Sequence, residues 1–133
     1  MRMVHVIDDD EVYRKVLVEM VGANGFSTRE FGSGFEYLQY AGLPQYLRPD
    51  MIFSDMNMPG MSGLEMLRKL ADIYPDIPCF IVTGNIDQFD QLDLISSSVR
   101  EVLCKPVTGS KIAALLEHYK SGRVEMTMPS SSA

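Results

Sequence analysis

The sequence predicts an α/β protein in which five parallel strands alternate with five helices. Apolar runs of strand length recur five times along the 133 residues, and a segment with helical periodicity follows each of them. Three of the runs are almost continuously apolar, which is typical of strands buried on both faces of a parallel sheet. The alternation therefore predicts a (βα)₅ fold, with right-handed crossovers that place helices on both sides of one sheet.

The five strands are predicted directly from these apolar runs, of which the second is the weakest. They cover residues 3–7, 28–31, 51–54, 79–82 and 101–104. The two cysteines of the chain, Cys79 and Cys104, lie in such runs and lack the spacing of metal ligands. We therefore expect both to be buried free thiols.

The first three helices are predicted from apolar rows and capping residues. The first carries two rows with i, i+4 spacing and stops at Asn24-Gly25. The second and third open with capping boxes, Ser33-Gly34-Phe35-Glu36 and Ser62-Gly63-Leu64-Glu65, and end at Gly42 and before Pro75. The two rows of the first helix are Val12, Val16 and Met20, and Tyr13, Leu17 and Val21.

The last two helices differ in the strength of their pattern. The fourth, at about residues 87–97, has only a thin apolar stripe, whereas the fifth starts near Thr108 with a regular row. That row consists of Ile112, Leu115, Leu116 and Tyr119. Residues 122–133 are rich in Ser and Met without any period, so we expect one domain over residues 1–121, followed by a flexible tail or a truncated linker.

Composition and charge exclude several classes of function. No apolar run approaches the roughly 18 residues that a membrane-spanning helix needs, and the N-terminus lacks a secretion signal. We therefore expect a cytoplasmic protein that does not contact the membrane. The net charge of −6 disfavours direct binding to nucleic acid and favours a bound cation or a basic partner.

The most informative residues follow the predicted strands directly. Ligands of such sheets bind at the carboxyl ends of the strands, so side chains at these ends are expected to share one site. Asp8 and Asp9 follow the first strand, Asp55 the third, Thr83 and Gly84 the fourth, and Lys105 the fifth.

These residue types predict a site for a divalent cation and a phosphoryl group. Crowded carboxylates repel one another and resist ionisation, but they suit Mg²⁺, which takes oxygen ligands and uses one or two carboxylates. Asp9 and Asp55 fit as direct ligands, with Asp8 holding a coordinated water. Asp55 is then placed to attack phosphorus and form an aspartyl phosphate. Thr83 and Lys105, together with the cation, neutralise the phosphoryl oxygens.

Each residue alone also has an ordinary structural explanation. Asp8 and Asp9 favour the positive end of a following helix, Asp55 fits a turn before Pro59-Gly60, and a lone Lys105 is usually a solvated charge. The combination at successive strand ends is what favours the functional interpretation. Gly60 and Gly84 lack a side chain, so we expect them to let the backbone approach a phosphoryl group closely.

Four segments carry a resemblance to a known family. They are Val6-Ile7-Asp8-Asp9-Asp10-Glu11, the Asp-x-x-Met-Pro-Gly-Met-x-Gly stretch within residues 50–63, Ile81-Val82-Thr83-Gly84, and Leu103-Cys104-Lys105-Pro106. In these segments the chain resembles bacterial two-component response-regulator receiver domains, including the stand-alone chemotaxis type. The resemblance covers residues 3 to 119. It implies a flavodoxin-like fold with strand order 2-1-3-4-5 and a cis peptide bond between Lys105 and Pro106.

The resemblance also implies roles for individual residues. Asp55 would be the phosphoacceptor, and Asp8 and Asp9 the acidic pair that holds Mg²⁺, with Mn²⁺ as a substitute. The backbone carbonyl of Asn57 would be a further metal ligand. The phosphoryl group would be contacted by Thr83, Gly84 and Lys105.

The same resemblance implies a signalling switch rather than an enzyme, although such a domain assists its own phosphorylation and dephosphorylation. The donor would be a sensor histidine kinase or a phosphotransfer domain. The signal would pass through the face formed by helix 4, strand 5 and helix 5 to a protein target, or to an output domain that is missing from this sequence. A homodimer through the fifth helix is left open.

One departure from the family pattern concerns Val102. Receiver domains usually carry Tyr or Phe three residues before the strand-five lysine, and that ring couples to the threonine. With Val102 there, the usual coupling cannot operate. Two alternatives stay open: a receiver-like interaction module that is never phosphorylated, which only Val102 supports, and a hydrolase with an aspartyl-phosphate intermediate. The hydrolase needs a general acid two residues after the nucleophile, where this chain has Asn57.

Overall fold

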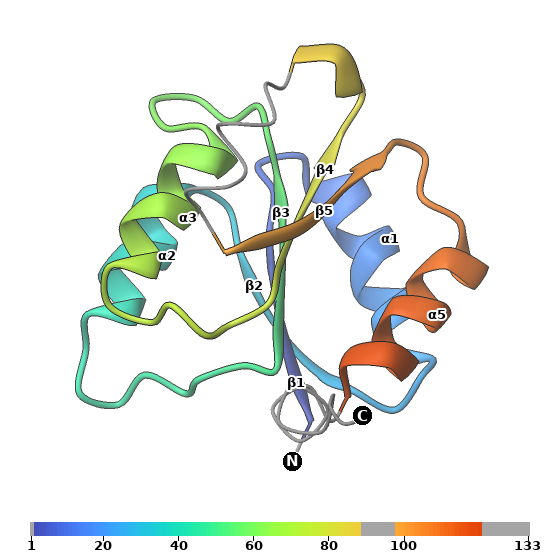
Figure 1. Ribbon diagram of the computed structural model, residues 1–133, viewed down its shortest axis with the longest axis horizontal. Coiled ribbons are helices and arrows are strands. Elements are labelled where there is room, and N and C mark those ends of the chain that lie inside the picture. Colours follow the sequence, from blue (N-terminus) through green and yellow to red (C-terminus); the bar gives the residue numbers. More distant parts are fainter. Residues whose placement is uncertain (1, 89–97, 121–133) are drawn as a thin grey trace, which may run out of the picture.

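In a computed structural model of the chain, which describes residues 2–88 and 98–120, five strands form a single parallel sheet (Figure 1). The strands are β1 (Met3–Ile7), β2 (Ser27–Phe31), β3 (Met51–Asp55), β4 (Cys79–Thr83) and β5 (Val99–Cys104). Their order is β2-β1-β3-β4-β5, and every neighbouring pair is parallel. The predicted fold class and strand order are therefore confirmed.

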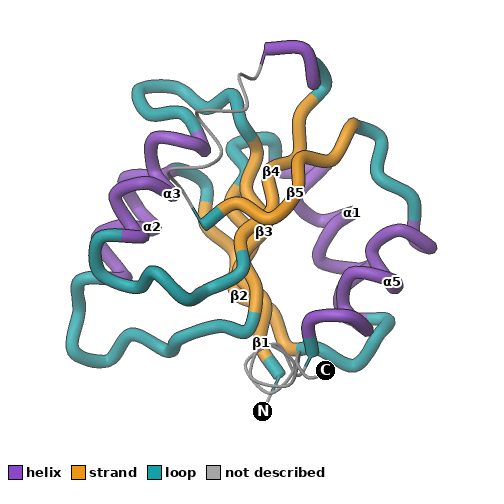
Figure 2. Tube along the Cα trace, in the orientation of Figure 1, coloured by secondary structure: helices purple, strands orange, loops and turns teal. Residues whose placement is uncertain are grey.

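Helices cover both faces of this sheet. The described helices are α1 (Glu11–Gly22), α2 (Gly34–Ala41), α3 (Gly63–Ala71) and α5 (Gly109–Tyr119), with a 3₁₀ turn η1 at Ile86–Gln88. Figures 1 and 2 show α1 and α5 on one side and α2 and α3 on the other. The turn η1 lies at the start of the predicted fourth helix. The rest of that predicted helix, residues 89–97, lies outside the described residues, as does the predicted tail.

The helices begin where side chains cap them. The Ser33, Ser62 and Thr108 hydroxyls each accept a hydrogen bond from a backbone N–H three residues later. On α1 the Asp10 carboxylate caps in the same way, accepting from the N–H groups of Val12 and Tyr13. These contacts satisfy N–H groups that the helix itself cannot pair, and they fix where each loop after a strand turns into a helix.

The sheet separates two hydrophobic cores, because successive side chains of a strand point to opposite faces. On the α1/α5 side Val4, Val6 and Phe53 pack against helix residues such as Leu17 and Ile112. On the α2/α3 side the strand residues Ile7, Ile52 and Ile81 pack against both helices. This layered burial makes the sheet a rigid platform for the residues at its edge.

The structure divides one apolar row of α1 between core and solvent, and it contradicts the expectation that both cysteines are buried. Val12 and Val16 are 76% and 38% exposed, whereas Met20 of the same row packs against the core that contains Leu17 and Val21. A 12-residue helix that covers one face of a sheet buries one stripe, so the first two residues of the other row are left to the solvent. Cys104 is also exposed, since β5 is an edge strand, whereas Cys79 is buried as predicted.

A buried polar residue, His5, lies at the centre of an aromatic cluster on the α2/α3 side. Its Nδ1 is 2.9 Å from the Tyr37 hydroxyl, and the ring has edge contacts with Phe31, Tyr37 and Tyr46. Burial, followed by the charge of Arg29, lowers the pKa of His5 to about 4. The imidazole is therefore neutral at pH 7.

No helix among the described residues is long and apolar enough to cross a membrane.

Candidate functional site

The parallel register brings the predicted site residues to the same edge of the sheet. Ile7 of β1 lies opposite Ser54 of β3, so the residues that follow them, Asp8 and Asp55, are neighbours. On the other side Asp55 lies opposite Val82, one residue before Thr83. The sequence prediction that these side chains share one edge is confirmed.

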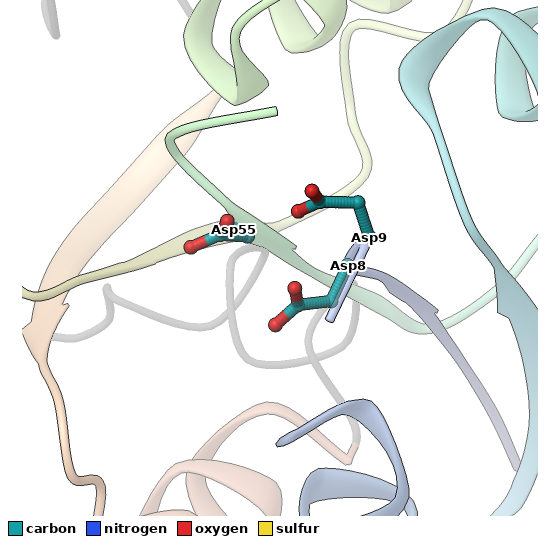
Figure 3. Close-up of side chains that lie close together, drawn as sticks. All are labelled: Asp8, Asp9 and Asp55. Carbon is teal, nitrogen blue, oxygen red and sulfur yellow. The ribbon is translucent and has the colours of Figure 1, made fainter. Parts of the chain in front are cut away.

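Three carboxylates meet at this edge (Figure 3). One oxygen from each of Asp8, Asp9 and Asp55 can be chosen so that all three lie within 4.8 Å of one another. Figure 3 shows Asp8 and Asp9 at the end of β1, with their carboxyl groups on the side where Asp55 lies at the end of β3. Asp8 is fully buried and Asp55 is 6% exposed, whereas Asp9 is open to solvent.

Asp8 is held in place but only partly satisfied. Its Oδ1 accepts a hydrogen bond of 2.9 Å from the Asp10 N–H, while its buried Oδ2 has no hydrogen-bond partner. Its backbone carbonyl accepts a hydrogen bond of 2.7 Å from Arg14, which is itself held by Glu30 of β2. Burial, together with the nearby charges of Asp55 and Asp9, raises the pKa of Asp8 to about 6 despite the Asp10 N–H and Lys105. A buried carboxylate oxygen that lacks a hydrogen-bond partner is suited to binding a cation.

Lys105 supplies the positive charge closest to Asp55. Its Nζ lies 3.0 Å from Asp55 Oδ1 and 3.8 Å from Asp8 Oδ2. The Lys105 N–H donates to the carbonyl of Thr83 at 2.8 Å, and the Lys105–Pro106 peptide bond is cis, as the family resemblance implied. Burial alone would lower the pKa of Lys105, but the hydrogen bond to Asp55 and the charges of Asp8 and Asp55 raise it. Lys105 is therefore protonated at pH 7.

The surroundings of Asp55 disfavour the ionised form of its carboxyl group. Burial raises its pKa above the usual value, although Lys105 acts in the opposite direction. Its backbone is fixed by close contacts: Ser54 Oγ donates to the Asp55 carbonyl at 2.9 Å, and the Gly63 N–H donates to the Met56 carbonyl at 2.8 Å. A Cβ atom at Gly63 would overlap that Asp55 carbonyl, so the start of α3 packs directly on Asp55.

The remaining predicted residues surround this centre. Thr83 is buried at the end of β4, and its hydroxyl accepts a hydrogen bond of 3.1 Å from the Asn85 N–H. Gly84 has open space where a Cβ would lie, and its predicted contact with a phosphoryl group stays a prediction. Asn57 is exposed two residues after Asp55, and Val102 is half-buried at the edge of the α2/α3 core.

Gly60 has a simpler explanation than the one predicted for it. Its φ of +83° is a conformation that favours glycine, and a Cβ there would be 2.8 Å from the Phe35 ring. The backbone conformation of the turn therefore accounts for glycine at this position, and the exposed Phe35 ring would have to move to admit a Cβ.

Sequence reasoning missed three contacts made by residues around this site. Arg14, Gly63 and Tyr13 act through partners that are 6, 8 and 94 residues away in the chain. In the sequence Gly63 belongs to a capping box and to the family-like stretch at residues 50–63, but neither pattern indicates its contact with the Asp55 carbonyl. Only the packing of α1 and α3 against the strand ends reveals them.

Comparison with known protein families agrees with this geometry. The family model of the response regulator receiver domain matches residues 4–117. The chain is 32% identical over 114 residues to the transcriptional regulatory protein FixJ of Rhizobium meliloti (strain 1021), covering 86% of this chain and 54% of FixJ. It is 30% identical over 127 residues to the DNA-binding transcriptional regulator NtrC of Escherichia coli (strain K12), covering 96% of this chain and 26% of NtrC.

Solved structures share the fold. A response regulator receiver domain protein from Clostridium thermocellum has a TM-score of 0.81 at 24% identity, covering 96% of this chain and all of that one. The receiver domain of the sensor histidine kinase PA1611 from Pseudomonas aeruginosa, solved with a magnesium ion in its active site cleft, has a TM-score of 0.78 at 19% identity, covering 90% and 98%. The present chain spans about half of the length of FixJ and a quarter of the length of NtrC. DNA binding is therefore stated only of NtrC, whose name includes it.

Proposed function

The chain belongs to the response regulator receiver domain family, and on that premise we propose that it is a phosphorylation-operated switch whose phosphoacceptor is Asp55. The observation that supports this most strongly is the placement of Asp55. Its carboxylate lies at a strand end, 3.0 Å from the Lys105 ammonium and beside a buried Asp8 oxygen that has no hydrogen-bond partner. A carboxylate nucleophile and a fixed cation are what phosphoryl transfer to an acid requires.

Mg²⁺ fits the residues around Asp55. The ligands would be Asp8, Asp9, Asp55 and the backbone carbonyl of Asn57, and Mn²⁺ would serve in its place. The orphaned Asp8 oxygen and the raised pKa of Asp8 are relieved by a bound cation. When bound, the cation would supply positive charge to the phosphoryl oxygens.

The transfer itself needs only positioning and charge from the chain. An oxygen of Asp55 forms a new P–O bond as the P–N bond of a phosphohistidine breaks, and the imidazole leaves with the electron pair of that bond. Lys105 and the Thr83 hydroxyl stabilise the phosphoryl oxygens, and Gly84 leaves room for them. Attack of water on phosphorus later returns Asp55 to its carboxylate and releases inorganic phosphate. The domain thereby assists its own modification without being an enzyme for another substrate.

The response would be a shift between two arrangements of the surface around β5 and α5, together with the segment that precedes β5. Phosphorylation favours one arrangement only through interactions that differ between the two. Val102 replaces the aromatic ring that usually takes part, so the movement would run through Thr83 and the loop after β4. Unchanged amide exchange in this region on phosphorylation would contradict such a shift.

The domain bounds, cellular location and partners of this switch are likewise proposals. We propose a receiver domain over residues 1–121, followed by a tail or linker, in the cytoplasm of a bacterial cell. Its donor would be a sensor histidine kinase or a phosphotransfer domain, and its output a protein target or a separate output domain. The receiver itself would bind neither nucleic acid nor membrane, and a homodimer through α5 is left as a second form of output.

Phosphorylation by acetyl phosphate tests this function. We expect Mg²⁺-dependent labelling of the wild type, no labelling in EDTA, and none in Asp55→Asn, which keeps the size of the side chain. Beryllofluoride with Mg²⁺ should bind the wild type and fail to bind the variant. A folded wild type that neither labels nor binds beryllofluoride would instead favour an interaction module that is never phosphorylated.

A further inference from the structure

We propose that Tyr13 is a positioning residue that holds Lys105 over Asp55. Tyr13 lies in the first turns of α1 and touches the β5–α5 connection twice. The Lys105 Nζ lies 4.5 Å from the centre of the Tyr13 ring, and the Tyr13 hydroxyl accepts a hydrogen bond of 3.1 Å from the Val107 N–H. The consequence for phosphorylation rests on the proposed function of Asp55, whereas the contact itself does not.

The ring restricts an otherwise flexible cation. A lysine ammonium ends a four-carbon stem with many rotamers, and the Lys105 side chain is 25% exposed. Asp55 and Asp8 attract it from the acidic side of the site, at 3.0 and 3.8 Å. The face of an aromatic ring attracts a cation without adding an anionic oxygen. Tyr13 therefore confines the ammonium near Asp55 and does not compete with Asp55 or an incoming phosphoryl group for its hydrogen bonds.

The hydroxyl fixes the backbone next to the lysine. Val107 is buried in the α1/α5 core, so its N–H needs a partner inside the protein. Tyr13 provides that partner two residues after Lys105, while the Lys105 N–H is bound to the Thr83 carbonyl at 2.8 Å. The main chain is thus held on both sides of the lysine, by β4 and by α1.

Two substitutions separate the ring from the hydroxyl. Tyr13→Phe keeps the aromatic face and loses the hydrogen bond, whereas Tyr13→Leu loses both. Cation–π contacts at partly desolvated sites correspond to roughly 2- to 30-fold in an equilibrium constant. We expect Tyr13→Leu to slow the labelling of Asp55 by acetyl phosphate by about three- to tenfold and Tyr13→Phe by about twofold or less. Tyr119→Leu is the matched control, because Tyr119 packs against the same core and contacts Phe80 at a ring distance of 5.2 Å.

Dependence on Lys105 distinguishes positioning from general destabilisation. In a Lys105→Met background the acceptor has no ammonium to position, so adding Tyr13→Leu should cause no further loss of labelling. The ε-methylene protons of Lys105 give a second readout by NMR. Ring currents should shift them upfield in the wild type and in Tyr13→Phe, and the shift should disappear in Tyr13→Leu.

The two readouts also separate this proposal from the function of the site. Equal slowing by Tyr13→Leu with and without Lys105, or Lys105 protons that do not respond to Tyr13→Leu, would overturn the positioning role. If the wild type is not labelled at all, the proposed function of Asp55 fails. In that case the Lys105 proton shifts alone decide whether Tyr13 holds the ammonium.

Discussion

Replacing Gly63 with alanine should reduce the stability of the protein and distort the site around Asp55, because the start of α3 packs on the backbone of Asp55. An added Cβ would overlap the Asp55 carbonyl oxygen and lie 2.8 Å from Ser54 Oγ and 3.1 Å from the Asp55 carbonyl carbon. Helix and strand would have to separate by roughly 1 Å to restore normal distances, which also weakens the Gly63 N–H bond to Met56. We expect a loss of about 2–4 kcal/mol in the free energy of unfolding and slower labelling of Asp55.

The chain provides matched controls for this substitution. Gly34 and Gly109 occupy the same position as Gly63, directly after the capping residue of a helix. A Cβ at Gly109 meets nothing within 4 Å, and one at Gly34 meets the Met61 and Met66 side chains at 3.2 Å. Gly109→Ala should therefore be neutral or slightly stabilising, and Gly34→Ala should fall between the two. Urea denaturation followed by circular dichroism measures all three, and a Gly63→Ala variant as stable as Gly109→Ala would refute the reasoning.

Three further predictions concern charge at and near the site. The pKa of Asp8 is raised from 3.8 to about 6. Ionisation of Asp8 therefore destabilises the folded protein, and this destabilisation develops as the pH rises from about 4 to 6. In EDTA, Asp8→Asn should therefore stabilise the protein by roughly 2–3 kcal/mol at pH 7.5 and hardly at pH 4; equal effects at both pH values would contradict this. The pKa of His5 is lowered from 6.5 to about 4 by its place in the fold. As the pH falls through this window, the unfolded chain binds a proton on His5 before the folded protein does, so the free energy of unfolding falls. His5→Phe should remove up to about 3 kcal/mol of that pH dependence between pH 7 and 4.5, measured by urea denaturation, and an unchanged slope would show that His5 is not its source. Lys105→Met removes a cation that lies 3.0 Å from Asp55, so it should tighten Mg²⁺ binding in calorimetry by roughly threefold or more while labelling falls; weaker Mg²⁺ binding would contradict the assigned geometry.

Much of the fold could be predicted because local chemistry determines it. The strand from Met3 to Ile7 and the helix starts after Ser33, Ser62 and Thr108 follow from apolar runs and capping residues that are visible in the sequence. The shared location of the site residues also follows, since parallel strands present their carboxyl ends at one edge.

The features that could not be predicted depend on tertiary packing. The exposure of Val12 and Val16 depends on which stripe of α1 meets the sheet, and both stripes are apolar in sequence. The exposure of Cys104 follows from the edge position of β5, which no local pattern encodes. The contact of Tyr13 with Val107 joins residues 94 positions apart and required the assembled fold.

Chemical mapping of the labelled residue tests the central claim most directly. After incubation with acetyl phosphate and Mg²⁺, borohydride reduction would convert an aspartyl phosphate to homoserine, and peptide mass spectrometry would locate it. Homoserine should appear at position 55 and nowhere else in the chain. Its appearance at Asp8 or Asp9, or its absence from a folded protein, would contradict the assignment of Asp55 as the acceptor.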